Sequence, residues 1–213
     1  MKNKAPVYFT LFLLIFSANM FSNQSSGFIS TAFNAIQSKD YSAALENYTK
    51  AIEKNPDYAP AHYGRGLSNY YLENYEAAAS NFQKAIDIDR NYFEAHYGVG
   101  ICKTKLGKFD EAISSFSMSA QLSSDYPEAI YGRGNANYYN KNYHAALTDY
   151  DKVIKLNPDY GLAYYGRAIS RQALKQYDQA LTDFDKYMEL RGDKDGLASE
   201  VKRLIQDIED YNN

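Results

Sequence analysis

The sequence predicts an all-α fold built from repeated antiparallel helix pairs. Related strings begin every 34 residues, as AHYGRGLSNYY from Ala61, AHYGVGICKTK from Ala95, AIYGRGNANYY from Ala129 and AYYGRAISRQA from Ala163. Within each period, two runs carry apolar residues at helical spacing and a short polar break separates them. A period of this length is typical of a repeat architecture, in which each unit buries its apolar face against its neighbours.

Five units of 34 residues align without insertion or deletion, at residues 25–58, 59–92, 93–126, 127–160 and 161–194. The eighth position is always small, the twentieth is always alanine, and the seventeenth and twenty-fourth are always aromatic. In that order the columns hold Ala32, Gly66, Gly100, Gly134 and Ala168; Ala44, Ala78, Ala112, Ala146 and Ala180; Tyr41, Tyr75, Phe109, Tyr143 and Tyr177; and Tyr48, Phe82, Phe116, Tyr150 and Phe184. Because a glycine inside a helix is destabilising, we expect the small columns to face each other where paired helices approach closely. The aromatic rings would fill the remaining space, and Gly64 would make room for a neighbouring ring.

Proline and polar residues mark the ends of the predicted helices. Pro56 and Pro158 follow the second helix of their units and end it, because proline donates no backbone hydrogen bond and disfavours helical angles in the residue before it. Pro60 and Pro127 fall in the first turn of the next helix, where a missing donor costs little. Each unit is therefore predicted to contain two helices.

The segments outside the five units have different predicted roles. Residues 1–22 place Lys2 and Lys4 before an apolar run from Val7 to Phe16, which is the layout of a secretory signal peptide. That run is shorter than the roughly 20 residues of a membrane-spanning helix, but an extension to Phe21 keeps an uncleaved N-terminal membrane anchor open, and a buried structural helix is the weakest alternative. We therefore expect an exported protein, periplasmic or secreted, with a membrane-anchored protein as the alternative.

After the fifth unit, residues 195–213 carry an apolar stripe at spacings of three and four residues. It consists of Ala198, Val201, Leu204, Ile205, Ile208 and Tyr211. The pattern predicts an amphipathic helix that caps the last repeat and keeps the end of the array soluble.

Over residues 25–194 the sequence resembles the tetratricopeptide repeat (TPR) family. The resemblance consists of the 34-residue unit and of small residues at the eighth and twentieth positions with an aromatic residue between them. It implies a right-handed superhelical solenoid that serves as a protein–protein interaction scaffold. One departure is a column of arginines, Arg65, Arg133 and Arg167, where the family usually has leucine.

The resemblance also implies that the first helix of each unit lines a concave groove. Its groove-facing positions are the second, fifth, ninth, twelfth and thirteenth of the unit, and they predict an aromatic, nearly uncharged ligand-binding groove. The residues singled out are Tyr63, Leu67, Tyr70, Tyr71, Tyr97, Ile101, Lys105, Tyr131, Asn135, Tyr138, Tyr139, Tyr165 and Ile169. Tyrosine suits peptide recognition because it combines a large rigid ring with a polar tip. The alternative is that these rings only pack on one another.

Composition and motifs argue against several other functions. The 23 basic and 26 acidic residues leave a net charge of -3, so no general attraction to nucleic acid is expected. Cys102 is the single cysteine, which excludes an intramolecular disulfide and a site with two thiolate ligands. The glycines of YGRG lie inside a predicted helix, whereas a phosphate loop needs them before one. We expect no cofactor, no metal and no catalytic residues.

The histidines and arginines are interpreted structurally. His62 and His96 share a column that the resemblance assigns to an aromatic residue, so packed rings are expected there. His144 lacks a nearby acidic or cysteine partner in the sequence. Each arginine of the column is followed sixteen residues later by a hydrogen-bonding residue: Asn81, Asp149 or Asp183. This favours the pairs Arg133 with Asp149 and Arg167 with Asp183 over a basic ladder for an acidic ligand.

The predicted function is that of a non-catalytic scaffold whose preformed groove binds a peptide or a partner segment of unknown identity. A structural assembly factor of a cell-envelope complex, acting through self-association or the convex face, is the alternative. A third possibility is an enzyme subunit that only positions substrate. Contact with a membrane is expected only through residues 1–22, if these are not cleaved.

Overall fold

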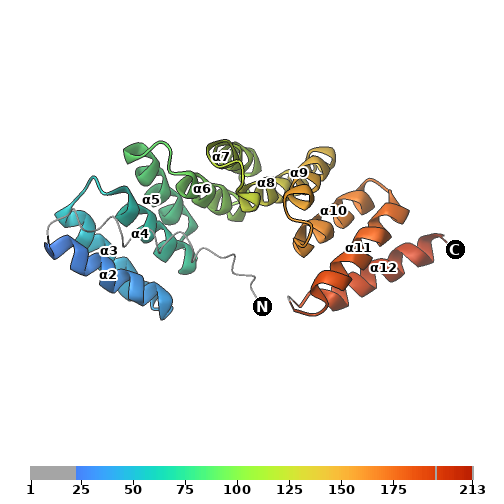
Figure 1. Ribbon diagram of the computed structural model, residues 1–213, viewed down its shortest axis with the longest axis horizontal. Coiled ribbons are helices and arrows are strands. Elements are labelled where there is room, and N and C mark those ends of the chain that lie inside the picture. The colour runs from blue at the N-terminus through green and yellow to red at the C-terminus, as the bar shows by residue number, and fades with distance from the viewer. Residues whose placement is uncertain (1–22, 195, 213) are drawn as a thin grey trace. The chain divides into compact units, whose positions relative to one another are not determined.

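Helices make up the described part of the chain, as predicted. The computed structural model describes residues 23–194 and 196–212, and within these ranges it contains eleven helices and no strand (Figure 1). The predicted signal peptide or anchor, residues 1–22, lies outside the described residues. The chain divides after Ser123 into two compact units, which we describe separately.

Residues 23–123 form three helix pairs. They are α2 (Asn23–Gln37) with α3 (Tyr41–Lys54), α4 (Ala59–Tyr71) with α5 (Tyr75–Ile88), and α6 (Phe93–Lys105) with α7 (Phe109–Leu122). Each helix packs mainly on the one before it and the one after it in the sequence. Residues 124–212 contain α8 (Pro127–Tyr139) with α9 (Tyr143–Leu156), α10 (Gly161–Ala173) with α11 (Tyr177–Arg191), and α12 (Ala198–Asn212).

Helix α12 occupies the segment predicted to cap the last repeat. Its apolar stripe buries Val201 and Ile208 in a cluster with Phe184 and Tyr187 of α11. Its polar side remains exposed, as expected for the end of a repeat array.

The turn between the two helices of a pair has the same geometry in all five pairs. At Glu73 the backbone φ is 64°, its N–H donates to the Tyr70 carbonyl, and the Asn74 N–H donates to the Asn69 carbonyl. This is a Schellman motif, which satisfies carbonyl groups at the end of the first helix. Lys39, Gly107, Lys141 and Lys175 occupy the same position with positive φ. Four of the five turns therefore place a non-glycine residue in the left-handed region.

The aromatic residue at the twenty-fourth position lies between two first helices. A Cβ added to Gly66 of α4 would lie 2.7 Å from the Phe82 ring, and one added to Gly98 of α6 would lie 2.8 Å from it. Tyr150 is held in the same way between Gly134 of α8 and Gly166 of α10, with corresponding distances of 2.8 Å and 2.6 Å.

This arrangement corrects one expectation and confirms another. The nearest side chain over Gly66 is the Phe82 ring and not the alanine column, because the ring needs the space that a missing Cβ leaves. Gly64 was expected to make room for a ring, and the Tyr48 ring does lie against it.

The predicted arginine pairs are present in the structure. Arg133 donates to Asp149 through Nη2 at 2.6 Å and Nε at 3.1 Å, and Arg65 Nε donates to Asn81 Oδ1. Arg167 donates to both carboxylate oxygens of Asp183, at 2.6 Å and 2.9 Å. These pairs tie the two helices of a unit together.

The last pair belongs to a larger network. Arg171 also donates to Asp183, and the second Nη of Arg167 reaches Asp151 of α9, each at 2.6 Å. Asp183 is 2% exposed, so its charge is stabilised by the two guanidinium groups and not by water. Arg167 therefore links α10 both to its own partner helix and to the helix before it.

His62 is a packed ring, as expected. Its Nε2 lies 2.8 Å from the Pro56 carbonyl, and its side chain is 4% exposed. Burial lowers the pKa of His62 below its ordinary value of 6.5, and the charges of Arg65 and Lys84 lower it further. The hydrogen bond to Pro56 and the charge of Asp57 oppose this shift.

Replacement of Gly98 by alanine tests the packing of the Phe82 ring against α6. The new Cβ would overlap the ring, so we expect the free energy of unfolding to fall by about 1–3 kcal/mol in a urea titration. Gly27→Ala in α2 is the matched control, because nothing lies within 4 Å of its added Cβ. Equal urea midpoints for the two variants would show that the ring does not depend on the missing Cβ.

Asp183→Asn tests the arginine network. Two guanidinium groups would lose their carboxylate, and we expect a loss of about 2–3 kcal/mol in the free energy of unfolding, somewhat less than for a fully buried pair because both arginines are partly exposed. Asp185→Asn, at an exposed site on the same helix, should change the stability by less than about 0.5 kcal/mol. A loss in D183N no larger than in D185N would contradict a stabilising role for the network.

His62 should make the stability depend on pH. Because its folded-state pKa lies below its value in the unfolded chain, the unfolded chain binds the proton more readily. The free energy of unfolding should therefore fall as the pH drops through 6.5 towards the folded-state pKa. His62→Phe should flatten this dependence between about pH 7.5 and pH 5.5, measured by urea unfolding at each pH. If the free energy of unfolding changes with pH equally in the variant and the wild type, His62 is not the source of the pH dependence.

Candidate functional site

The predicted groove residues lie on the first helices of the repeats. In residues 23–123, α4 carries Tyr63, Leu67, Tyr70 and Tyr71, and α6 carries Tyr97, Ile101 and Lys105. In residues 124–212, α8 carries Tyr131, Asn135, Tyr138 and Tyr139, and α10 carries Tyr165 and Ile169. Their spacing of three, four, seven and eight residues places each set along one side of its helix.

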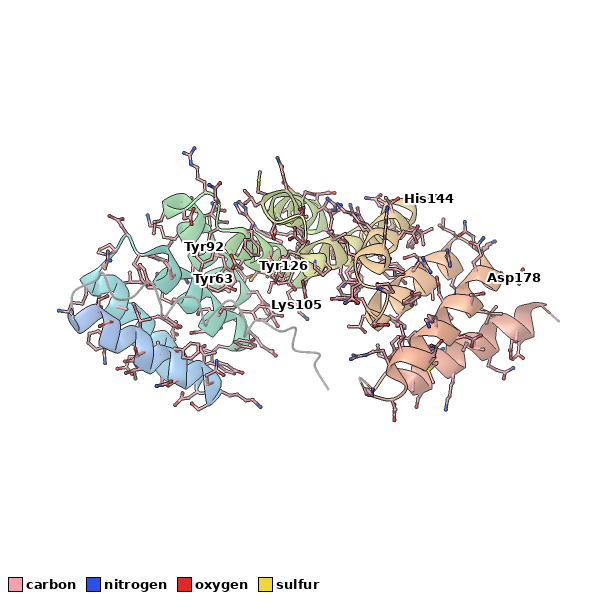
Figure 2. The ribbon with its side chains drawn as sticks, viewed as in Figure 1. Tyr63, Tyr92, Lys105, Tyr126, His144 and Asp178 are labelled. Carbon is pink, nitrogen blue, oxygen red and sulfur yellow. The ribbon has the colours of Figure 1, made fainter. Side chains whose placement is uncertain are left out.

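The fifth-position tyrosines pack on other rings. Tyr63 lies 5.4 Å from Phe82 and 5.1 Å from Tyr92, between ring centroids (Figure 2). Tyr131 contacts Tyr150 and Tyr160 in the same way, at 5.9 Å and 5.2 Å. In these two repeats the column therefore connects the aromatic residue inside the repeat to the tyrosine that closes it.

Two of the predicted ligand contacts are buried. Tyr63 and Leu67 are each 3% exposed, so neither offers a side chain to a partner. Tyr97, Ile101, Tyr131, Tyr165 and Ile169 are half-buried and keep part of their surface open.

Asn135 serves the core as well as the surface. Its Oδ1 accepts a hydrogen bond of 2.7 Å from the hydroxyl of Tyr150, a ring that is fully buried. Burial raises the pKa of Tyr150 well above its ordinary value, so this phenol is a permanent donor at neutral pH. Asn135 thus satisfies the one polar atom of an otherwise apolar ring.

The more open tyrosines gather where α4 and α8 end. On α8, Tyr138 packs edge-on against Tyr139 at 5.6 Å and lies 5.6 Å from Tyr143 at the start of α9. Tyr139 is 57% exposed, which is unusual for a large aromatic side chain. On α4, Tyr70 contacts Tyr71 and Tyr75 in the same pattern, and Tyr71 stacks on Tyr41 at 4.5 Å.

Sequence reasoning missed part of this surface. Tyr75 and Tyr143 occupy the seventeenth position, which was interpreted only as a packing column. The feature of the sequence that could have identified them is their position directly after the turn that follows Tyr71 and Tyr139. Glu200 was also missed, because nothing in the sequence of α12 relates it to α10. In the structure the Tyr165 hydroxyl donates to Glu200 Oε1 at 3.0 Å.

Lys105 is the basic residue among the predicted contacts. It is exposed at the end of α6 (Figure 2). Its neighbour Lys103 is engaged by Glu111 of α7, so the two lysines have different surroundings. Lys105 remains a predicted ligand contact.

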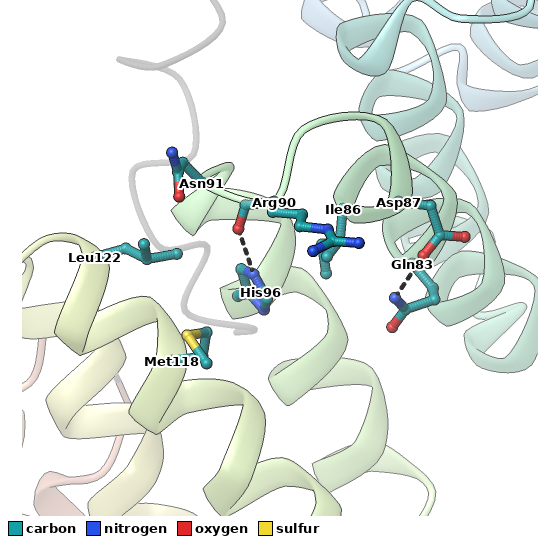
Figure 3. Close-up of a pocket in the computed structure, with 8 residues that line it drawn as sticks. All are labelled: Gln83, Ile86, Asp87, Arg90, Asn91, His96, Met118 and Leu122. Atoms are coloured by element: carbon teal, nitrogen blue, oxygen red, sulfur yellow. Dashed lines mark hydrogen bonds between the residues drawn. The ribbon is translucent and has the colours of Figure 1, made fainter.

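Two hollows lie on the surface of residues 23–123. The larger, of about 660 Å³, is lined by Gln83, Ile86, Asp87, Arg90, Asn91, His96, Met118 and Leu122 (Figure 3). Its polar groups engage one another, since Gln83 donates to Asp87 at 3.0 Å and His96 Nε2 lies 3.1 Å from the Arg90 carbonyl. A second hollow, of about 460 Å³, lies over His62, Arg65 and Asn81.

The described residues offer no metal site. No group of three or more His, Cys, Asp or Glu residues within them is placed to hold a metal ion. Cys102 is fully buried, and burial raises the pKa of its thiol to about 12, so it is a poor nucleophile at neutral pH. None of the helices in residues 23–194 and 196–212 has the length and apolar character needed to span a membrane.

Comparison with known proteins identifies the repeats. Family models described as "Tetratricopeptide repeat" match residues 59–92, 127–160 and 162–192, and one described as "TPR repeat" matches residues 36–72. No curated protein matches the chain by sequence.

Solved structures share the fold at low sequence identity. MamA of Desulfovibrio magneticus RS-1 is 17% identical, with 82% of this chain and 99% of that chain covered and a TM-score of 0.76. YrrB, described as "a TPR protein with an unusual peptide-binding site", is 22% identical, with 91% and 97% covered and a TM-score of 0.70. PilF of Pseudomonas aeruginosa is 17% identical, with 83% and 79% covered and a TM-score of 0.72. Since the family models together match more than half of the sequence, the chain belongs to the tetratricopeptide repeat family.

Proposed function

We propose that the chain is a non-catalytic protein–protein interaction scaffold that binds a peptide or partner segment on the aromatic side of its first helices. The observation that carries this proposal is the exposure of Tyr139 beside Tyr138 and Tyr143. Exposed tyrosine rings give large contact area at low cost in side-chain entropy, which is why they recur in binding surfaces. The peptide-binding site named for YrrB, a protein of the same fold, is consistent with it.

The mechanism of this scaffold would be passive. The rings at the fifth position fix the first helices to the core, and the rings at the twelfth and thirteenth positions are therefore presented on a rigid support. A surface that is ordered before binding loses less conformational entropy on association. The proposal assigns no reaction to the chain.

We further propose that the protein acts outside the cytoplasm, because Lys2, Lys4 and the apolar run from Val7 to Phe16 have the layout of a signal peptide. Retention of this segment as a membrane anchor is the alternative. N-terminal sequencing of the native protein separates the two, since cleavage gives a chain that begins after the apolar run and anchoring leaves the run in place.

A photo-crosslinking residue at position 139 tests the binding surface directly. With benzoyl-phenylalanine in place of Tyr139, we expect covalent capture of a partner in cells. The matched control is the same residue in place of Leu156, which is exposed on α9, a second helix. Capture at 156 without capture at 139 would contradict the proposal and favour the assembly role, and a product that joins two copies of the chain would identify self-association.

The double variant Tyr138→Ala, Tyr139→Ala should weaken the binding of the captured partner by about tenfold or more, because aromatic anchors dominate binding energy. Isothermal titration calorimetry with the purified partner measures this. Leu156→Ala is the control and should leave the affinity unchanged. Equal affinities of the double variant and the wild type would overturn the assignment of these rings.

A further inference from the structure

Three tyrosines and one carboxylate lie within electrostatic range of one another in residues 124–212. Tyr138 and Tyr139 come from α8, Tyr165 from α10 and Glu200 from α12. The Tyr165 hydroxyl donates to Glu200 Oε1 at 3.0 Å, and this bond fixes the direction of the carboxylate. Tyr138 and Tyr139 are close enough to Tyr165 to interact with it electrostatically, and Tyr138 also interacts with Glu200. Three separate helices thus contribute to one cluster.

The charge of this cluster is not balanced by the protein. Within the described residues no lysine or arginine forms an ion pair with Glu200, and Arg203, one turn later on α12, pairs with Asp207. The arginines of α10 are also engaged elsewhere, since Arg167 and Arg171 both bind Asp183. The negative charge of Glu200 therefore lies on this part of the aromatic face without a basic partner.

The aromatic face around the cluster adds no positive charge. The second, fifth, ninth, twelfth and thirteenth positions of α8 and α10 contain no lysine or arginine; they hold Glu128, Tyr131, Asn135, Tyr138, Tyr139, Leu162, Tyr165, Ile169, Gln172 and Ala173. Burial raises the pKa of both Tyr138 and Tyr165, and the hydrogen bond to Glu200 raises that of Tyr165 further. Both rings are consequently neutral at physiological pH, and their faces carry the partial negative charge of an aromatic quadrupole.

We propose that Tyr138, Tyr139, Tyr165 and Glu200 form a binding site for a lysine or arginine side chain of the partner segment. The cation would lie against the tyrosine faces and donate to the free lone pairs of the Glu200 carboxylate, which combines a cation–π interaction with a charge-assisted hydrogen bond. The stem of the basic side chain would cover the apolar ring edges. This inference rests on the proposed function and states the chemistry of the segment that the face binds.

Nuclear magnetic resonance with small probes tests the site in the full-length protein. The probes are the Nα-acetyl methylamides of lysine, norleucine and glutamate, of which norleucine has an alkyl chain without the ammonium group. We expect the lysine probe to shift the ring signals of Tyr138, Tyr139 and Tyr165 in a saturable way, and added salt to weaken the binding. The norleucine and glutamate probes should bind several-fold more weakly, as judged from the shifts of the same ring signals. Equal shifts from lysine and norleucine, or none from lysine, would overturn the proposal.

Two matched variants of α12 separate the carboxylate from general effects of charge. Glu200→Gln should lower the affinity for the lysine probe by about three- to fivefold, which is the range expected for the loss of an exposed ion pair. Glu209→Gln removes the same charge nine residues later, on the opposite side of the helix, and should leave the affinity unchanged. Both glutamates are exposed, and thermal unfolding of each variant verifies that the fold is intact. Equal affinities of E200Q and E209Q would overturn the role of Glu200.

Longer peptides distinguish failure of this inference from failure of the proposed function. The probes are three sets of twelve-residue peptides that carry net positive, zero and negative charge. If the neutral or acidic peptides shift the tyrosine signals and the basic peptides do not, the proposed site for a basic residue is overturned. The proposed peptide-binding function would still stand. No binding by any set would overturn both, and preferential binding of the basic set that is lost in E200Q supports both.

Discussion

The position of one aromatic ring between two glycine-bearing helices determines much of the rest of the structure. Phe82 belongs to α5, yet the helices on both sides of it lack a Cβ where the ring meets them, at Gly66 and Gly98. Each glycine lowers the helix propensity of its own helix, and the packing of a large ring against two backbones offsets that cost. Because the same ring contacts the first helix of its own repeat and that of the next, it sets the spacing within a pair and between pairs together.

This constraint divides the tyrosines into two groups. Those at the fifth position contact the ring column, so that Tyr63 is 3% exposed and Tyr131 and Tyr165 are half-buried. Those two turns further along the helix, such as Tyr139, lie beyond the reach of that column and stay at the surface. The residue type is the same in both groups, so the difference in burial arises from the position of each tyrosine relative to the neighbouring rings.

The sequence predicted the repeat, the helices and the arginine pairs well, because each depends on local spacing or on residues within one repeat. The sixteen-residue separation of Arg133 and Asp149 is enough to place them on facing helices of one pair. The sequence did not predict the left-handed turns at Glu73, Lys141 and Lys175, since these positions are not occupied by glycine, the residue that normally indicates positive φ. Tertiary contacts and the Schellman hydrogen bonds outweigh that local preference.

The candidate site was harder to predict than the fold. Tyr63 and Leu67 satisfied the same positional rule as Tyr139, but burial depends on the volume of rings contributed by the next helix, which a positional rule does not contain. Glu200 could not be found at all, because its relation to Tyr165 spans 35 residues and arises only when α12 packs at the end of the array. Local patterns thus identify the helices that carry the site, and the three-dimensional structure identifies which of their side chains are open.

The central claim is that Tyr139 belongs to a binding surface and Tyr63 to the core. Chemical nitration, mapped by mass spectrometry with and without a bound partner, measures the reactivity of both tyrosines in one experiment and so tests both parts of the claim. We predict that Tyr139 reacts rapidly in the free protein and is protected by the partner, whereas Tyr63 remains unreactive in both states. A Tyr139 that reacts equally with and without the partner, or a Tyr63 that reacts as fast as Tyr139, would contradict the account.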